Sequence, residues 1–214
     1  MLPKQIPKVK KVSVLIDYAN ILSSALSMKK HTNMEILYEY LVSIPYIKKI
    51  TIYYGTNPRN PKSANFIKSL EKIGYEVVTK NVKFIKINIH ELVRTGQNKD
   101  LLDRLDKKVV NYFLKEVDKL GKHGYFLEQP KCNLDIEIAL DMFQSFSLFD
   151  GFILFSGDGD FSSITKLARA SGKHVTVVAL RKFLAGELFQ SANCYINFML
   201  FKNLKGFLYN PSKK

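Results

Sequence analysis

The feature that most constrains the fold is an alternation of short apolar runs with longer helix-like segments. The first run, Val12–Ile16, is apolar apart from Ser13, as is typical of a strand buried on both faces of a parallel sheet. Helix-like segments separate the runs. One of them, Pro61–Ile73, starts with a proline that a first helical turn tolerates and is followed by Gly74. This alternation predicts an α/β fold with a mainly parallel central sheet flanked by helices.

The expected elements cover most of the chain between a basic N-terminal tail, 1–10, and a basic C-terminal tail, 206–214. The expected strands are 12–16, 49–54, 75–79, 83–89, 151–155, 174–180 and 194–198. The expected helices are 34–43, 61–73, 98–120, 133–143, 161–170 and 183–191. Strand 83–89 alternates polar and apolar side chains, which predicts a half-exposed edge.

The helix over 98–120 is the least expected element of the domain, which we place at residues 11–205. One face is apolar and the other mixes lysines and arginine with aspartates. A solvated helix face explains mixed charge most simply. The alternative is a helical insertion, within residues 91–130, that touches the substrate.

The charge of the chain is strongly basic. It has 33 Lys and Arg residues against 19 Asp and Glu, a net charge of +14 over 214 residues. Such an excess favours a polyanionic partner, with nucleic acid ahead of an anionic membrane. No stretch approaches the roughly 18 apolar residues of a membrane span. Cys132 and Cys194 lack the spacing of a zinc site, and the N-terminus lacks an apolar signal core. We therefore expect a soluble, cytoplasmic protein with no membrane partner.

Acidic side chains follow two of the expected strands. Asp17 comes directly after the first strand, and Asp158 and Asp160 follow strand 151–155. The carboxyl ends of parallel strands share the edge of a sheet at which ligands bind. A further acid, Asp135, lies near the start of a helix. We therefore expect these acids to meet in one pocket.

A pocket that collects several carboxylates is unstable unless a cation neutralises their repulsion. Mg²⁺ and Mn²⁺ prefer such oxygen ligands and promote hydrolysis of phosphodiesters. Each acid also has a structural explanation. Asp158 suits a turn beside glycine, Asp160 suits the cap of the next helix, and Asp135 suits a first helical turn. The combination, more than any single residue, favours a metal site.

The acidic segments resemble the NYN domain family, and within it the LabA-like branch of the PIN-like nuclease group. The similarity covers about residues 11–198, with the motifs in the family's order and spacing. The segments that carry it are Ile16-Asp17-Tyr18-Ala19-Asn20, Leu134-Asp135 with Ala139-Leu140-Asp141, and Ser156-Gly157-Asp158-Gly159-Asp160-Phe161. The resemblance implies a PIN-like, Rossmann-like three-layer fold and a Mg²⁺- or Mn²⁺-dependent ribonuclease acting on RNA.

Roles for individual residues follow from the same resemblance. The first three acids, Asp17, Asp135 and Asp158, would be both catalytic and metal-binding, and Asp160 would be an outer or alternate metal ligand. Asn20 and Ser156 would position the substrate.

Three basic residues are candidates for phosphate contacts. Arg181 and Lys182 follow the strand that ends near Leu180, on the same edge of the sheet as Asp158. Lys131 stands one residue further from the acidic motif than the family's lysine does, and Asn133 replaces a glycine, so its role is left open.

Two other functions are kept as alternatives. Asp158-Gly159-Asp160 is similar to the late acidic motif of haloacid-dehalogenase-like phosphatases, but Ala19 stands where their general acid is needed. A non-catalytic RNA-binding or scaffold module would suit the basic charge and the 15 Phe and 11 Tyr residues. Binding a polyanion gains nothing from carboxylates, however, which favours the nuclease. A homodimer is left open.

Overall fold

The computed structural model describes residues 2–3, 9–87, 103–126 and 128–210. The chain divides into two compact units. The first combines Met1–Asn81 with Asn133–Lys214, and the second is Val82–Cys132. Within the described ranges, no helix is both long enough and apolar enough to cross a membrane.

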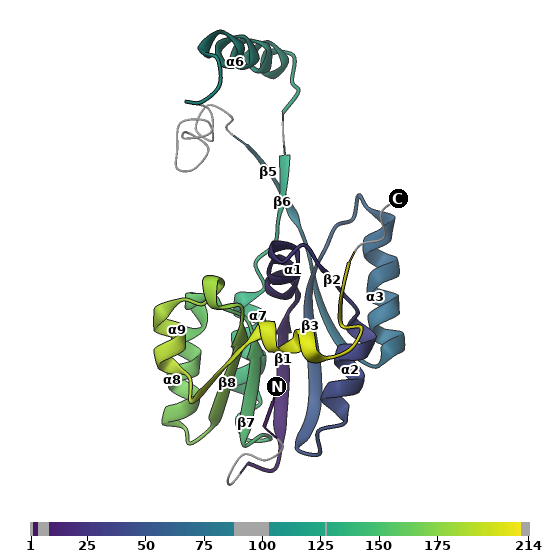
Figure 1. The fold of residues 1–214 in the computed structure, drawn as a ribbon, viewed down its shortest axis with the longest axis vertical. Coiled ribbons are helices and arrows are strands. Elements are labelled where there is room, and N and C mark those ends of the chain that lie inside the picture. Colours follow the sequence, from purple (N-terminus) through teal and green to yellow (C-terminus); the bar gives the residue numbers. More distant parts are fainter. Residues whose placement is uncertain (1, 4–8, 88–102, 127, 211–214) are drawn as a thin grey trace. The chain divides into compact units, whose positions relative to one another are not determined.

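A six-stranded sheet forms the centre of the first unit, with the strand order β4-β3-β1-β7-β8-β9 (Figure 1). Every neighbouring pair in this sheet is parallel, which confirms the predicted sheet type. The strands are β1 (Val12–Asp17), β3 (Ile47–Thr56), β4 (Glu76–Asn81), β7 (Gly151–Phe155), β8 (His174–Ala179) and β9 (Cys194–Asn197).

Two hydrophobic cores lie on opposite faces of this sheet, so the unit has the predicted three layers. Strand β1 contributes to both cores because its side chains alternate: Val14 and Ile16 join one core and Leu15 the other. The first core also includes side chains of α1 (Tyr18–Ser27), α2 (Met34–Val42) and α3 (Pro61–Ile73). The second includes side chains of α7 (Asp135–Gln144), α8 (Ser162–Ala170) and α9 (Gly186–Ser191).

Helix α3 forms over the residues that its sequence predicts. The Asn60 side chain accepts a hydrogen bond from the amide of Lys62 at 3.1 Å, and Pro61 occupies the first turn. Gly74 ends the helix at φ 118°, a left-handed conformation that glycine adopts without strain.

The ends of the first unit contribute to its core. Phe198, Phe201 and Phe207 pack together with ring centroids 5.9–6.1 Å apart, and Leu2 is buried in the same cluster. After the 3-10 segment η3 (Phe198–Asn203), β10 (Leu208–Tyr209) pairs with β2 (His31–Thr32). Leu2, Phe207 and Leu208 fall within the stretches expected as tails, yet their side chains are packed in or against the core.

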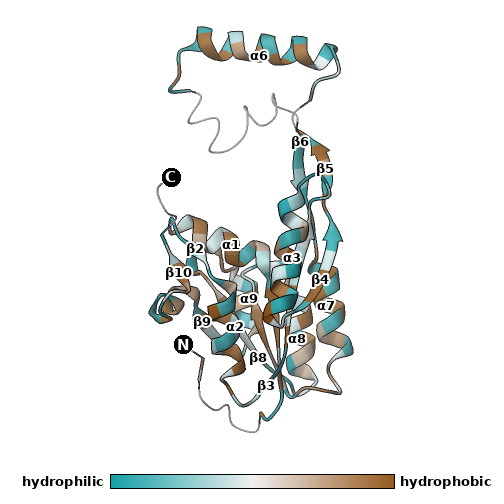
Figure 2. Cartoon of the chain, turned by 90° about the vertical axis from the view of Figure 1, so that its right-hand side faces the viewer, coloured by the Kyte–Doolittle hydropathy of each residue, from teal (hydrophilic) through white to brown (hydrophobic). Residues whose placement is uncertain are grey.

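In its described residues, the second unit contains an antiparallel pair of strands and one helix. Strand β5 (Lys83–Lys86) pairs with β6 (Glu128–Lys131), so this segment is not the edge of the central sheet that its alternation predicted. Helix α6 (Lys107–Lys122) begins where the Asp106 side chain caps the amide of Lys108 at 2.7 Å. Brown and teal bands alternate along α6 in Figure 2, as expected of an amphipathic helix. Residues 98–102 of the expected helix lie outside the described part.

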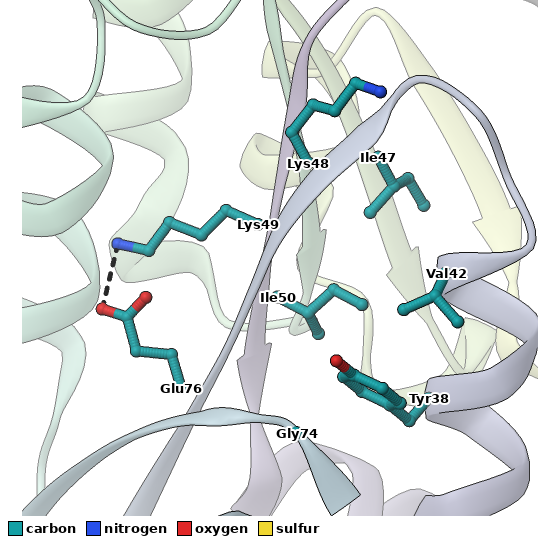
Figure 3. A pocket seen from close by; sticks show the side chains of 8 residues that line it. All are labelled: Tyr38, Val42, Ile47, Lys48, Lys49, Ile50, Gly74 and Glu76. Atoms are coloured by element: carbon teal, nitrogen blue, oxygen red, sulfur yellow. Dashed lines mark ion pairs between the residues drawn. The ribbon is translucent and has the colours of Figure 1, made fainter.

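A polar cluster ties β3 to α7 within the first unit. The Lys49 ammonium lies 3.2 Å from Oε1 of Glu76 (Figure 3). It also lies 3.3 Å from Oδ1 of Asp141. The hydroxyls of Tyr53 and Ser145 also donate to Asp141. Burial and the bond to Asp141 raise the pKa of Tyr53, so its hydroxyl stays protonated. Asp141, the acid that ends the second family segment, thus joins two layers of the fold.

Replacing Asp141 by alanine is expected to lower the free energy of unfolding by about 2–4 kcal/mol, since it leaves a half-buried ammonium and a buried hydroxyl without their acceptor. Urea unfolding measures this effect. Glu76→Ala is the matched control because Glu76 is more than half exposed, and it should cost about 0–1 kcal/mol. Equal losses in the two variants would contradict a structural role for Asp141.

Candidate functional site

The chain order of the sheet reverses between its two central strands. From β1 the chain continues outward through β3 and β4, and from β7 it continues in the other direction through β8 and β9. Ile16 at the end of β1 pairs with Phe155 at the end of β7, so Asp17 and Ser156 follow side by side. Such a reversal opens a crevice at the carboxyl edge, where ligands of parallel α/β sheets bind.

Asp17 is held in this crevice by the start of α1 and the end of β7. Its carboxylate accepts hydrogen bonds from the amide of Asn20 at 3.3 Å and from the hydroxyl of Ser156 at 3.2 Å. Ser156 is fully buried, and its hydroxyl in turn accepts from the amide of Asp158. Burial raises the pKa of Asp17 to about 6, against the opposing effect of these bonds, and the charge of Asp135 adds to the rise.

Three further carboxylates converge beside Asp17. Asp135, Asp158 and Asp160 each present an oxygen, and the three oxygens lie within 4.8 Å of one another. Burial and the charge of Asp158 raise the pKa of Asp135. The structure therefore brings together three of the four predicted metal ligands. Asp17 stands outside this closest group, although it is near enough for its pKa to respond to Asp135.

The backbone fixes the positions of the clustered acids. Asp135 is the first residue of α7, and its amide donates to the Asn133 side chain at 2.8 Å. Asp158 caps the 3-10 turn η1 (Gly159–Phe161) by accepting from the amide of Asp160 at 3.0 Å. Asp160 itself was the expected helix cap. Helix α8 has no side-chain cap, however, so the carboxylate of Asp160 is available to the cluster.

The donor set of this cluster fits a hard divalent cation. All of its ligand atoms are carboxylate oxygens, which Mg²⁺ and Mn²⁺ prefer. Ligands on opposite sides of a Mg²⁺ ion are about 4.2 Å apart, so the present separations need only small side-chain movements. Burial is the main cause of the raised pKa of Asp135, and the charges of Asp158 and Asp160 add to it, so a cation would relieve this repulsion.

A hollow of about 530 Å³ opens beside Asp158. Its lining residues are Asn20, Ser23, Gly157, Asp158, Gly159, Lys182, Phe183, Leu184 and Ala185. It thus extends from the start of α1, across the acidic loop, to the segment after β8. A volume of this size is in the range of small-molecule and cofactor sites.

Close packing of the backbone forms one wall of the hollow. The amide of Ala185 donates to the carbonyl of Gly157 at 2.9 Å. A Cβ on Gly157 would lie 2.3 Å from the carbonyl oxygen of Phe183, and one on Gly159 would lie 2.2 Å from Glu187. The acidic loop therefore needs Gly157, where a Cβ would meet backbone, whereas a Cβ at position 159 would meet the end of the exposed Glu187 side chain, which can move away.

The three predicted phosphate-binding residues belong to two different units of the chain. Lys182 lines the hollow, on the 3-10 turn η2 (Arg181–Phe183). The neighbouring Arg181 is exposed, with its guanidinium 5.3 Å from the ring centroid of Phe189. Lys131 belongs to β6 of the second unit, where it pairs with Lys83. Sequence reasoning missed Phe183 and Ser23 as lining residues.

A second, smaller hollow of about 240 Å³ lies at the other end of the sheet (Figure 3). It surrounds the start of β3, and its lining residues include Tyr38, Lys49 and Glu76. None of the predicted site residues lines it, so it does not compete with the crevice as the candidate site.

The fold and the acidic crevice together define a PIN-like α/β domain. A family model described as the NYN domain matches residues 11–200, and the chain belongs to this family. The low amplitude and bright protein LabA of Synechococcus elongatus is 30% identical over 159 residues, which are 74% of this chain and 67% of LabA. These matches confirm the family and the LabA-like branch that the sequence motifs indicated.

A solved structure supports the fold independently. A protein of unknown function from Vibrio parahaemolyticus superposes with a TM-score of 0.60 over 90% of this chain and 95% of that chain. Their sequences are 19% identical, so this similarity concerns the fold alone.

Proposed function

We propose that this protein is a Mg²⁺- or Mn²⁺-dependent ribonuclease that hydrolyses phosphodiester bonds of RNA. The observation that carries the proposal is the convergence of Asp135, Asp158 and Asp160 within 4.8 Å at the reversal point of the sheet. Membership in a family of PIN-like nucleases and the net charge of +14 support it.

In this proposal the four acids together form the metal-binding site. Asp135, Asp158 and Asp160 hold the metal, and Asp17 joins them on the β1 side, oriented by Ser156 and the Asn20 amide. When bound, the metal supplies charge for the phosphate oxygens and makes a water acidic enough to attack at neutral pH. Ser156 positions Asp17 and has no access to substrate, because it is fully buried. The Asn20 side chain, at the rim of the hollow, positions the RNA.

The setting of the protein is also part of the proposal. Neither Cys132 nor Cys194 is in a disulfide, which agrees with a cytoplasmic location and cytoplasmic RNA as the partner. The expected helical insertion lies within the second unit, and a homodimer remains open.

A substrate panel tests the proposal and separates it from its alternatives. The protein is incubated with RNA, with DNA of the same sequence and with a phosphomonoester, in Mg²⁺, in Mn²⁺ and in EDTA. We expect cleavage of RNA only with metal. Hydrolysis of the phosphomonoester without RNA cleavage would instead support a phosphatase. Tight RNA binding without cleavage in either metal would support the non-catalytic module.

Removing the two basic side chains of η2 should weaken RNA binding and its dependence on salt. Each lost phosphate contact lowers the slope of log affinity against log salt by about 0.7 for a single strand, so Arg181→Ala with Lys182→Ala should lower it by up to about 1.4. All RNA sequences should be affected alike, because phosphate contacts carry no base information. A salt titration measures both effects.

The matched control for this double variant is Lys68→Ala with Lys72→Ala, which removes the same charge from the exposed face of α3. If both double variants change the slope equally, general charge and not the η2 residues governs RNA binding. The RNA would then follow another surface, and the basic residues of α6 would be examined next.

A further inference from the structure

The geometry of the hollow points to a nucleobase subsite. We propose that Phe183 is a stacking platform for one unpaired base of the RNA, next to the phosphodiester that the acid cluster cleaves. This inference rests on the proposed function, since it assigns the hollow to part of the same substrate.

One face of the Phe183 ring is open to a ligand. Phe183 exposes 39% of its surface while lining the hollow. The Lys182 ammonium lies over the ring, 4.8 Å from its centroid. A cation reaches that position only where no other protein group covers the ring face. Because the Lys182 side chain is long and exposed, a nucleobase can displace it from the ring face.

The backbone that carries the Phe183 ring packs against the acidic loop. The amide of Phe183 donates to the carbonyl of Leu180 at 2.8 Å, and its carbonyl oxygen packs against Gly157. Two residues further on, Ala185 is bonded to Gly157, which is the residue before Asp158. A platform anchored on rigid backbone orders a bound base at little further cost in entropy.

The other lining residues match the remaining parts of a nucleotide. Lys182, displaced from the ring, can neutralise the phosphate of the stacked nucleotide. The side chains of Asn20 and Ser23 offer polar groups for the sugar or the base edge. Stacking on an aromatic ring accepts any base, since every base has a π-face. The subsite therefore selects for an unpaired base and not for a particular sequence.

The first unit offers a matched control for this platform. Phe189, on α9, exposes a similar 45% of its surface. It contacts Arg181 and Tyr195, with the Tyr195 ring at 5.7 Å, and it is not among the residues that line the hollow. Phe189→Ala removes an exposed aromatic ring of equal size from the same region, but outside the proposed subsite.

Binding of an RNA that carries 2-aminopurine tests the proposal without relying on cleavage. The fluorescence of this base is quenched when it stacks. In EDTA, the parent protein should quench it at one position of the oligonucleotide. Phe183→Ala should abolish this quenching and weaken binding about tenfold, the typical loss when one base–aromatic stack is removed. Phe183→Tyr should restore both, and Phe189→Ala should behave as the parent.

The same test can be made by changing the RNA. An oligonucleotide with an abasic residue at the quenched position should bind the parent more weakly than the intact RNA does, whereas Phe183→Ala should bind the two RNAs equally. Equal quenching and affinity in the parent and Phe183→Ala, or a parent that binds no RNA in EDTA, would overturn the subsite. Cleavage in Mn²⁺ is scored separately. If the base stacks but the RNA is not cleaved, the subsite is supported and the ribonuclease is rejected. If Phe183→Ala cleaves RNA as the parent does, the ribonuclease is supported and the subsite is rejected.

Discussion

Asp158→Asn is expected to lower the rate of metal-dependent RNA cleavage by about 10³-fold or more, equivalent to roughly 4 kcal/mol of transition-state stabilisation. Asp158 is the acid that joins the cluster to the hollow, because it lies within 4.8 Å of the Asp135 and Asp160 oxygens and also lines the hollow. An amide there removes one of the negative charges that hold the metal. Single-turnover cleavage of end-labelled RNA in Mn²⁺ measures the loss.

The fold should survive this substitution. Asparagine retains the carbonyl oxygen that accepts the Asp160 amide, and it is as good a cap as aspartate. Thermal unfolding of Asp158→Asn without metal should therefore stay close to that of the parent. The control is Glu71→Gln, which neutralises an exposed acid on α3 and should leave cleavage unchanged. If Asp158→Asn cleaves RNA at nearly the parental rate, Asp158 is not a residue of the catalytic metal site.

Asp17→Asn is expected to stabilise the metal-free protein at pH 7–8 while abolishing cleavage. Burial raises the pKa of Asp17 from 3.8 to about 6, so the folded state holds the proton more tightly than the unfolded state does. The stability that this group contributes is then fully present below pH 3.8, and it is lost as the pH rises through 6. A rise of about two pKa units corresponds to at most about 3 kcal/mol.

The asparagine variant should lack this pH dependence. Its free energy of unfolding in EDTA should exceed that of the parent by about 1–3 kcal/mol at pH 7.5, and the difference should vanish below pH 4. Urea unfolding between pH 4 and pH 8 measures the two profiles. Added Mn²⁺ should stabilise the parent more than Asp17→Asn, since it binds the folded acids. A variant that is less stable than the parent at pH 7.5 in EDTA would make Asp17 a structural helix cap.

The central strands and their acids could be predicted because the signals are local. Val12–Asp17 and Gly151–Phe155 are apolar runs that are buried on both faces, and the acids stand where the runs end. Helix α1 was not predicted, since its buried face consists of Ile21, Ser24 and Ala25, and two of these are small residues that give a weak apolar pattern. Strand β6 was missed because it carries Pro130, which is unusual within a strand.

The hollow beside the acids could not be predicted from the sequence. Gly157 and Gly159 suggest a flexible turn, but neither has a positive φ. Gly157 is needed because the backbone of Phe183, far along the chain, packs against it. Phe183 could not be identified as a site residue either, because it lies in a segment expected to be an ordinary helix. Asp141 shows the converse, because it stands in a motif of the family while its contacts join β3 to α7.

The most direct test of the account is the rate of RNA cleavage measured across a Mn²⁺ titration, with the parent and Asp135→Asn prepared in parallel. The parent should cleave at a rate that rises to saturation with Mn²⁺, stop in EDTA and recover when Mn²⁺ is restored in excess. Asp135→Asn should remain at the background rate or require far more metal. Cleavage by the parent that is equally fast in EDTA, or identical Mn²⁺ dependence in the two proteins, would contradict a metal-dependent ribonuclease built on these aspartates.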